Sequence, residues 1–359
     1  MPRVRDGGPD GHQVTPSGES SAVMTAVRQR RTGPSVTRPL PAPASSASAG
    51  SRAARDPHQY ALVAELHGHH RLQAAQHLVH QVRGRLRQGA QGSPRLGAIA
   101  GAQQGERSDP GTRHVAADLA ADHTVICPDL RGYGAGDKPA DADGTTYAKR
   151  TMAADIVARA RALGHRRFAL IGHDRGALVA FRAGLDHPAA LTHLACLDVL
   201  PTLDMWNVMH GTTAAVGFHL YLMAQPPGLP ERMIAADPDA FFGRFLDIWT
   251  NTPQAIPGDI RAAYLDACRT AVTSIVAYYR ASAHIDVDHD QADRDAGNRL
   301  RMPVTVLQRD WGAAFGFDAH ALWKAWAPDL THTAGTCGHF MAEEAPEEVA
   351  TALRRLLLR

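Results

Sequence analysis

The stretch Arg167-Phe-Ala-Leu-Ile-Gly-His-Asp-Arg-Gly-Ala-Leu-Val-Ala-Phe-Arg182 decides the fold. Its apolar run at 168–171 predicts a buried strand, and the helical spacing of the apolar residues after Gly176 predicts a helix. Asp174 lies between them in a tight turn with Gly172 and Gly176, where the strand and helix backbones approach closely. The amides of the helix N-terminus favour negative charge at this point. The turn therefore predicts a nucleophilic carboxylate, with an N-cap aspartate as the simpler alternative.

Composition excludes several classes of protein. The chain of 359 residues is long enough for one large α/β domain or two smaller ones. Its 38 Lys and Arg nearly balance its 36 Asp and Glu, so nothing indicates binding to nucleic acid or to an anionic membrane. The four cysteines are widely spaced, which favours a reduced, cytoplasmic protein over a disulfide framework or a zinc site. No apolar run approaches the ~20 residues of a membrane span, and the start of the chain lacks a secretory signal.

Residues 1–113 differ in composition from the rest of the chain. They contain no Lys, Phe, Trp or Cys, and Gly, Pro, Ser, Ala, Arg, Gln and His dominate. Such a segment buries too little apolar area to offset its ordering entropy, so we expect it to be disordered, with at most a weak helix over 62–82. The abrupt change at its end suggests a shifted reading frame or a misassigned start.

From Val115 onward, buried strands alternate with helices. Strands are expected at 124–128, 168–171, 194–199, 304–308 and 330–334. This alternation predicts a mostly parallel sheet covered by helices on both faces. Residues 201–300 break the alternation with aromatic-rich helical sequence, which we interpret as an inserted cap. The expected organisation is thus an α/β core of residues 114–200 and 301–359 with a helical cap of residues 201–300.

Three polar residues follow three predicted strands. Asp174, Asp198 and His339 are far apart in the sequence, but the carboxyl ends of parallel strands meet at one edge of the sheet. A nucleophile, an acid and a histidine in this order form the catalytic set of hydrolases with this topology. Asp310, directly after another strand, is the alternative acid.

At these residues the chain resembles the aspartate-nucleophile α/β-hydrolases, most closely the haloacetate (fluoroacetate) dehalogenases, with epoxide hydrolases as relatives. The similar stretches include Asp129-Leu-Arg-Gly-Tyr-Gly134, Gly172-His-Asp-Arg-Gly176, Asp288-His-Asp-Gln-Ala-Asp-Arg-Asp-Ala-Gly297 and Gly338-His-Phe340. The resemblance implies an α/β-hydrolase fold, no cofactor or metal, a small-molecule substrate with water, and possible homodimers, which are common in the family.

The resemblance also assigns roles. It implies that Asp174 is the nucleophile, His339 the base that activates water, and Asp198 its acidic partner. Arg175 would bind the substrate carboxylate, while His219 and Tyr279 would hold the leaving halide. The implied reaction is cleavage of carbon–halogen bonds in short 2-haloacids through an aspartyl ester that water then hydrolyses.

The chain departs from the family pattern at three places. Leu178 replaces a second Arg, and Leu220 replaces a Trp that follows the cap histidine. The sequence at 103–106 is Gln-Gln-Gly-Glu instead of His-Gly-x-Pro, and the first N-terminal strands appear missing or replaced.

Two alternatives remain open. One is an epoxide hydrolase with the same Asp–His–Asp set, in which Tyr279 acts with Tyr221, Tyr264 or Tyr278. The other is an inactive, truncated or frameshifted homologue.

Overall fold

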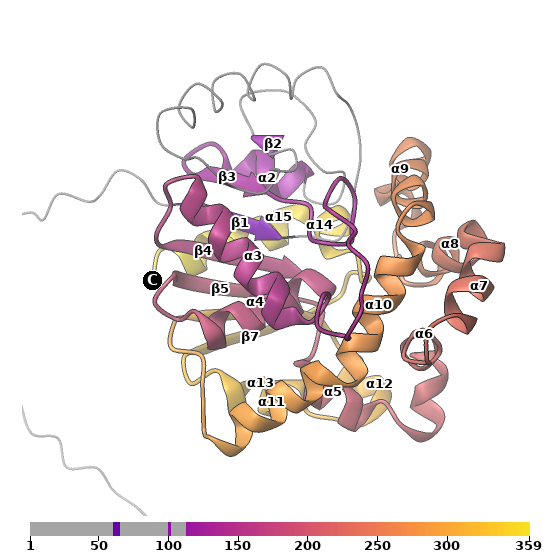
Figure 1. The fold of residues 1–359 in the computed structure, drawn as a ribbon. Coiled ribbons are helices and arrows are strands. Elements are labelled where there is room, and N and C mark those ends of the chain that lie inside the picture. Colours follow the sequence, from indigo (N-terminus) through magenta and orange to yellow (C-terminus); the bar gives the residue numbers. More distant parts are fainter. Residues whose placement is uncertain (1–59, 65–99, 102–112) are drawn as a thin grey trace, which may run out of the picture. The chain divides into compact units, whose positions relative to one another are not determined.

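The computed structural model describes residues 60–64, 100–101 and 113–359. Within them, seven strands form one sheet in the order β2-β3-β1-β4-β5-β6-β7 (Figure 1). β2 is antiparallel to β3, and the other neighbouring strands are parallel. The strands are β1 (Tyr60–Ala64), β2 (Ala100–Gly101), β3 (Thr124–Cys127), β4 (Phe168–His173), β5 (Leu191–Leu197), β6 (Val304–Arg309) and β7 (Leu330–Gly335). The mostly parallel sheet predicted from the sequence is confirmed.

Both faces of the sheet are buried at its central strand β4. Successive side chains of a strand point to opposite faces. Leu170 of β4 accordingly packs in the cluster that includes helices α3 and α4, whereas Ala169 and Ile171 pack in the cluster that includes α2 and α15. This two-sided burial explains the continuous apolar sequence of β4. The helices around the sheet are α2 (Arg113–Leu119), α3 (Lys149–Ala162), α4 (Arg175–Asp186), α12 (Trp311–Phe315), α13 (Ala319–Trp326), α14 (Met341–Glu344) and α15 (Pro346–Leu357).

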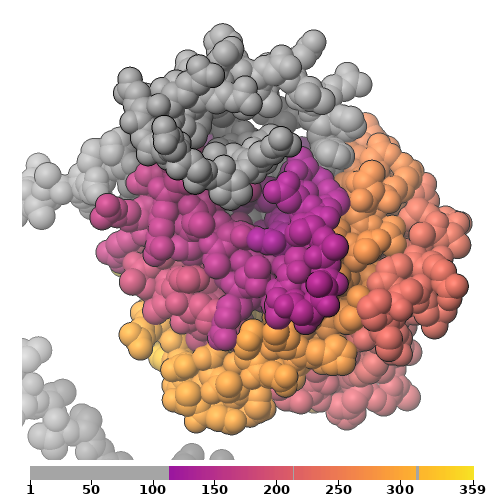
Figure 2. Space-filling view, viewed as in Figure 1, coloured from indigo at the N-terminus to yellow at the C-terminus, as the bar shows by residue number. Residues whose placement is uncertain are grey.

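Seven α-helices follow one another between β5 and β6. Figure 1 shows α6 to α9 beside the sheet, with α10 running between them and the strands. In Figure 2 these residues form the salmon and orange part of the surface, next to the purple residues of the core. They are α5 (Thr202–Val208), α6 (Phe218–Met223), α7 (Leu229–Ala236), α8 (Pro238–Ile248), α9 (Gly258–Arg269), α10 (Val272–Ala283) and α11 (Ile285–Asp295).

Buried ion pairs join α11 to the core. Lys149 of α3 lies 2.7 Å from Asp286, and both side chains are almost fully buried. Arg182 of α4 pairs with Asp290 and Asp293. Removing one partner of a buried pair costs about 3–5 kcal/mol, because the other charge stays desolvated. The acidic run at 288–297 therefore attaches the inserted helices to α4, the helix that follows Asp174.

The structure describes only two short parts of the segment 1–112. Residues 62–64 belong to β1, paired in parallel with β3 and β4, and not to the helix predicted over 62–82. That expectation was wrong for these residues because the apolar run Tyr60–Ala64 finds partners in strands far along the chain. The predicted disorder, the missing N-terminal strands and the sequence at 103–106 otherwise lie outside the described residues.

Candidate active site

Asp174 occupies the turn between β4 and α4. Its φ is 46°, a left-handed conformation that is uncommon for residues other than glycine and is found at functional turns. A Cβ on Gly172 would overlap the backbone of Gly176 and Ala177, which explains the need for glycine before the turn. The backbone N–H of Asp174 donates to the carbonyl of Leu197 on β5 (3.0 Å). The neighbouring strand thus fixes this aspartate at the carboxyl edge of the sheet.

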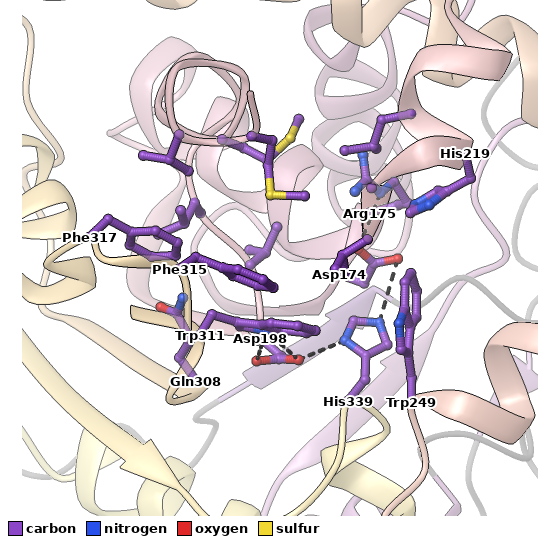
Figure 3. A pocket seen from close by; sticks show the side chains of 18 residues that line it. Asp174, Arg175, Asp198, His219, Trp249, Gln308, Trp311, Phe315, Phe317 and His339 are labelled. Carbon is purple, nitrogen blue, oxygen red and sulfur yellow. Dashed lines mark hydrogen bonds and ion pairs between the residues drawn. The ribbon is translucent and has the colours of Figure 1, made fainter. Parts of the chain in front are cut away.

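His339 lies between two carboxylates (Figure 3). Its Nδ1 donates to Asp198 Oδ2 over 2.7 Å, and its Nε2 is 3.9 Å from Asp174 Oδ2. The backbone N–H of Arg309 (2.8 Å) and the indole N–H of Trp311 (3.2 Å) also donate to Asp198. The structure therefore brings Asp174, His339 and Asp198 together. The side chain in hydrogen-bonding distance of His339 is that of Asp198, whereas Asp310 is exposed.

The backbone around His339 is held on both sides. Its N–H donates to the carbonyl of Trp249 (2.7 Å), and its carbonyl accepts from His173 Nε2 (2.7 Å). These contacts set the direction of the imidazole between the two aspartates.

The opposite charges of Arg175, Asp174 and His339 stabilise one another. Although burial opposes its ionisation, the Arg175 guanidinium and His339 hold the pKa of Asp174 well below its usual range. Burial would lower the pKa of His339, but the carboxylates of Asp174 and Asp198 on either side of the ring raise it to about 9. At neutral pH the resting site therefore holds an ionised Asp174 beside an imidazolium.

Arg175 supplies the positive charge next to Asp174. Its Nε donates to Asp174 Oδ1 (3.2 Å), and its guanidinium lies 4.6 Å from the centre of the Tyr279 ring. Its Nη1 is buried with no hydrogen-bond partner among the described residues. A desolvated guanidinium N–H of this kind favours an anion. Leu178, one helical turn further, stands where the family pattern has a second Arg. Its apolar side chain is fully buried in the core, so the site has no second cation at this position.

The inserted helices contribute three neutral groups. His219 is 5% exposed, its ring centre lies 5.7 Å from that of Tyr279, and its Nδ1 has no partner among the described residues. Burial and the nearby Arg175 lower the pKa of His219 to about 3, so the imidazole is neutral. Burial raises the pKa of Tyr279, which keeps its hydroxyl protonated. Trp249 lies 5.3 Å from His219 and 5.1 Å from His339 between ring centres.

Sequence reasoning did not assign Trp249 or Trp311 to the site. Trp249 lies in the aromatic-rich segment interpreted as packing, and no motif surrounds it. It nevertheless lies against His219, with 5.3 Å between the ring centres. Trp311 follows β6 at the carboxyl edge of the sheet, and this position could have indicated from the sequence that it belongs to the site.

The three tyrosines considered as partners for Tyr279 donate their hydroxyls to other groups. Tyr221 donates to the carbonyl of Met209, Tyr264 to Glu343, and Tyr278 to the carbonyl of Arg175 (3.0 Å). The Tyr278 contact supports the backbone of the turn that carries Asp174.

A pocket of about 110 Å³ opens onto these groups. Figure 3 shows Arg175, His219 and Trp249 around Asp174 and His339, with Trp311, Phe315 and Phe317 on the opposite side. In the described part of the chain, no group of three or more His, Cys, Asp or Glu is arranged to hold a metal ion. None of the helices described is long and apolar enough to cross a membrane.

Comparison with known proteins gives consistent matches. The family model of the alpha/beta hydrolase fold matches residues 108–259. A fluoroacetate dehalogenase from Burkholderia sp is 34% identical over 251 residues, which cover 68% of this chain and 81% of the relative. A soluble epoxide hydrolase from Corynebacterium sp. (strain C12) is 30% identical, with coverage of 67% and 84%. A crystal structure of a proposed α/β hydrolase from Nostoc sp PCC 7120 aligns with a TM-score of 0.68 and 30% identity, over 84% of this chain and 91% of that one.

Proposed function

Since the chain belongs to the α/β-hydrolase family that includes a fluoroacetate dehalogenase and epoxide hydrolases, we propose that it cleaves the carbon–halogen bond of short 2-haloacids. Membership of this family identifies the chain as a hydrolase. The dehalogenase proposal depends mainly on one observation: beside the Asp174 carboxylate, the buried Nη1 of Arg175 has no hydrogen-bond partner in the part of the chain that the structure describes. A cation there can hold the substrate carboxylate while the adjacent carbon meets the nucleophile.

In the first step, an Asp174 carboxylate oxygen attacks C2 of the haloacid. A C–O bond forms, the carbon–halogen bond breaks, and its electron pair leaves with the halide. Arg175 would keep the substrate carboxylate in place. The neutral imidazole of His219, the Tyr279 hydroxyl and the Trp249 indole are the available donors for the leaving anion, and burial strengthens such hydrogen bonds.

In the second step, His339 removes a proton from water, and the water oxygen attacks the ester carbonyl of Asp174. The bond between the carbonyl carbon and the ester oxygen on C2 breaks, His339 returns the proton to that oxygen, and a 2-hydroxy acid is released. Esterification abolishes the Asp174 charge, one of the two that raise the pKa of His339, so this pKa falls, the imidazolium loses its proton to solvent, and the neutral imidazole becomes available as the base for this step. Asp198 keeps the ring in the required tautomer.

Halide release from chloroacetate, compared with diol formation from styrene oxide, tests the proposal. We expect halide release with chloroacetate and little diol. The epoxide hydrolase alternative predicts the reverse, and it is supported by the epoxide hydrolase relatives. Against it, Tyr221, Tyr264 and Tyr278 all donate their hydroxyls elsewhere.

Activity toward neither substrate, in a chain with a cooperative melting transition, would favour the inactive homologue. We also propose that the inserted helices act as a cap over the site, that the protein is cytoplasmic, and that it forms a homodimer.

A further inference from the structure

The pocket extends well beyond the groups that a haloacetate needs. One half contains Asp174, Arg175, His219, Trp249 and His339. The other half is an apolar chamber, formed by side chains from α5, the residue that follows it, α12 and the loop after α12. The chamber is lined by Met205, Val208, Met209, Trp311, Phe315 and Phe317. A two-carbon acid held by Arg175 with C2 at Asp174 has no further carbon to place there.

The chamber wall is held in place without a ligand. The indole N–H of Trp311 donates to Asp198 (3.2 Å), and the Arg309 guanidinium lies 4.2 Å from a Trp311 ring centre. The Phe315 ring stacks on Trp311 with 5.4 Å between centres and 14° between planes. A preformed apolar wall binds apolar groups with little ordering cost.

The size of the pocket limits what the chamber can hold. The whole pocket, with the reacting groups and the chamber together, has a volume of about 110 Å³. The chamber is only a part of this volume, so it has room for a short alkyl group and not for a fused ring system. The pocket is also lined by the polar side chain of Gln308. This side chain is 1% exposed, and its Nε2 has no partner among the described residues.

We propose that the apolar chamber binds an alkyl substituent on C2, so that the preferred substrates are 2-halocarboxylates with a short alkyl side chain. The inference rests on the proposed function, because Arg175 and Asp174 set the position of the carboxylate and of C2. Asp174, His339 and Arg175 would act on every 2-haloacid in the same way, and the chamber would decide which of these acids binds most tightly.

The first test measures binding without turnover. Acetate, propanoate, butanoate and 3-methylbutanoate carry the same carboxylate and no leaving group, and their binding can be followed by the fluorescence of Trp249 and Trp311 in the pocket. We expect the dissociation constant to fall roughly threefold to fourfold for each added methylene that is buried. Equal constants across the series, or no binding of any of these acids, would overturn the inference.

Matched variants locate the effect. Val208→Phe fills the chamber, and we expect it to abolish the gain from acetate to 3-methylbutanoate. Leu229→Phe makes the same kind of change at a half-exposed position on α7 outside the pocket, and we expect the gain to persist. A gain that survives Val208→Phe would contradict the chamber as its cause.

Turnover separates this inference from the proposed function. Halide release from 2-chloro-3-methylbutanoate with a lower KM than from chloroacetate supports both. Halide release from chloroacetate without tighter binding of the alkyl acids overturns the inference alone. Tighter binding of the alkyl acids without halide release from any 2-chloroacid overturns the dehalogenase proposal and leaves the chamber as an apolar binding site.

Discussion

Asp174, Asp198 and His339 lie at the ends of strands of the sheet, whereas His219, Trp249 and Tyr279 come from the helices inserted between β5 and β6. The backbone N–H groups of both aspartates donate to neighbouring strands, and both aspartates have positive φ. The inserted residues meet the sheet-borne groups mainly through rings: Trp249 lies 5.1 Å from His339 between ring centres, and the Tyr279 ring centre lies 4.6 Å from the Arg175 guanidinium. The difference indicates that the sheet sets the chemistry and the inserted helices tune binding. Substitutions in the two regions should therefore differ in size and in kind.

The largest effect is expected for His339→Gln. It removes the base of the second step but leaves the Asp174 nucleophile, so steady-state halide release should fall by roughly 10²–10⁴-fold. One equivalent of halide should still be released, and mass spectrometry should detect a substrate adduct on the protein. A variant that turns over without such an adduct would contradict the role of His339.

The ion pairs of His339 with Asp174 and Asp198 should also make the stability of the protein depend on pH. The folded-state pKa of His339 is raised to about 9 from 6.5, so its contribution is complete below pH 6.5 and is lost as the pH rises through 9. The expected loss is about 3 kcal/mol. Urea unfolding of the wild type and of His339→Gln, near pH 6.5 and at about pH 10, checks this. The difference in free energy of unfolding between the two proteins should shrink with rising pH, and a constant difference would refute the pairing.

A smaller effect is expected for Arg175→Lys. The ammonium keeps the charge beside Asp174 but lacks the planar fork of the guanidinium. The loss of a charge-assisted hydrogen bond of about 2 kcal/mol corresponds to a rise in KM for chloroacetate of roughly 30-fold. Arg269→Lys, at an exposed ion pair with Asp239, is the matched control and should leave KM unchanged. An unchanged KM in Arg175→Lys would show that the substrate carboxylate binds elsewhere.

The smallest effects belong to the inserted helices. Tyr279→Phe and Trp249→Phe each remove one neutral donor, worth about 1 kcal/mol or roughly fivefold in kcat/KM. The loss should be greater with fluoroacetate than with bromoacetate, because fluoride is the poorer leaving group. Tyr221→Phe, an exposed position, provides the comparison. Losses as large as that of His339→Gln would remove the distinction between the two regions.

The sequence predicted the sheet-borne part of the site better than the rest. The turn at Asp174 has a local signal, a buried strand followed by two spaced glycines and a helix, and Asp198 and His339 follow predicted strands. The positions of these three residues relative to one another then follow from parallel topology alone. Their placement was therefore predictable, although their catalytic roles stay proposals.

Trp249 and Gln308 could not be predicted in this way, and for Trp311 the end of β6 was the one indication. Their places in the pocket depend on how separate helices and strands pack against one another. Such contacts follow no fixed spacing of residues along the sequence. The acidic run at 288–297 was visible only as a family resemblance, and the structure gives it a physical role in ion pairs with Arg182. β1 was missed because its five apolar residues lie in a segment of otherwise low apolar content.

The central claim is that Asp174 forms an ester with the substrate, and single-turnover hydrolysis in ¹⁸O-labelled water tests it most directly. With enzyme in excess over chloroacetate, the water oxygen attacks the carbonyl of the ester and stays in the carboxylate. We therefore predict that ¹⁸O appears in the peptide containing Asp174 and that the glycolate formed is unlabelled. Label in the glycolate with none in this peptide would mean that water attacks the substrate directly, and it would contradict the account.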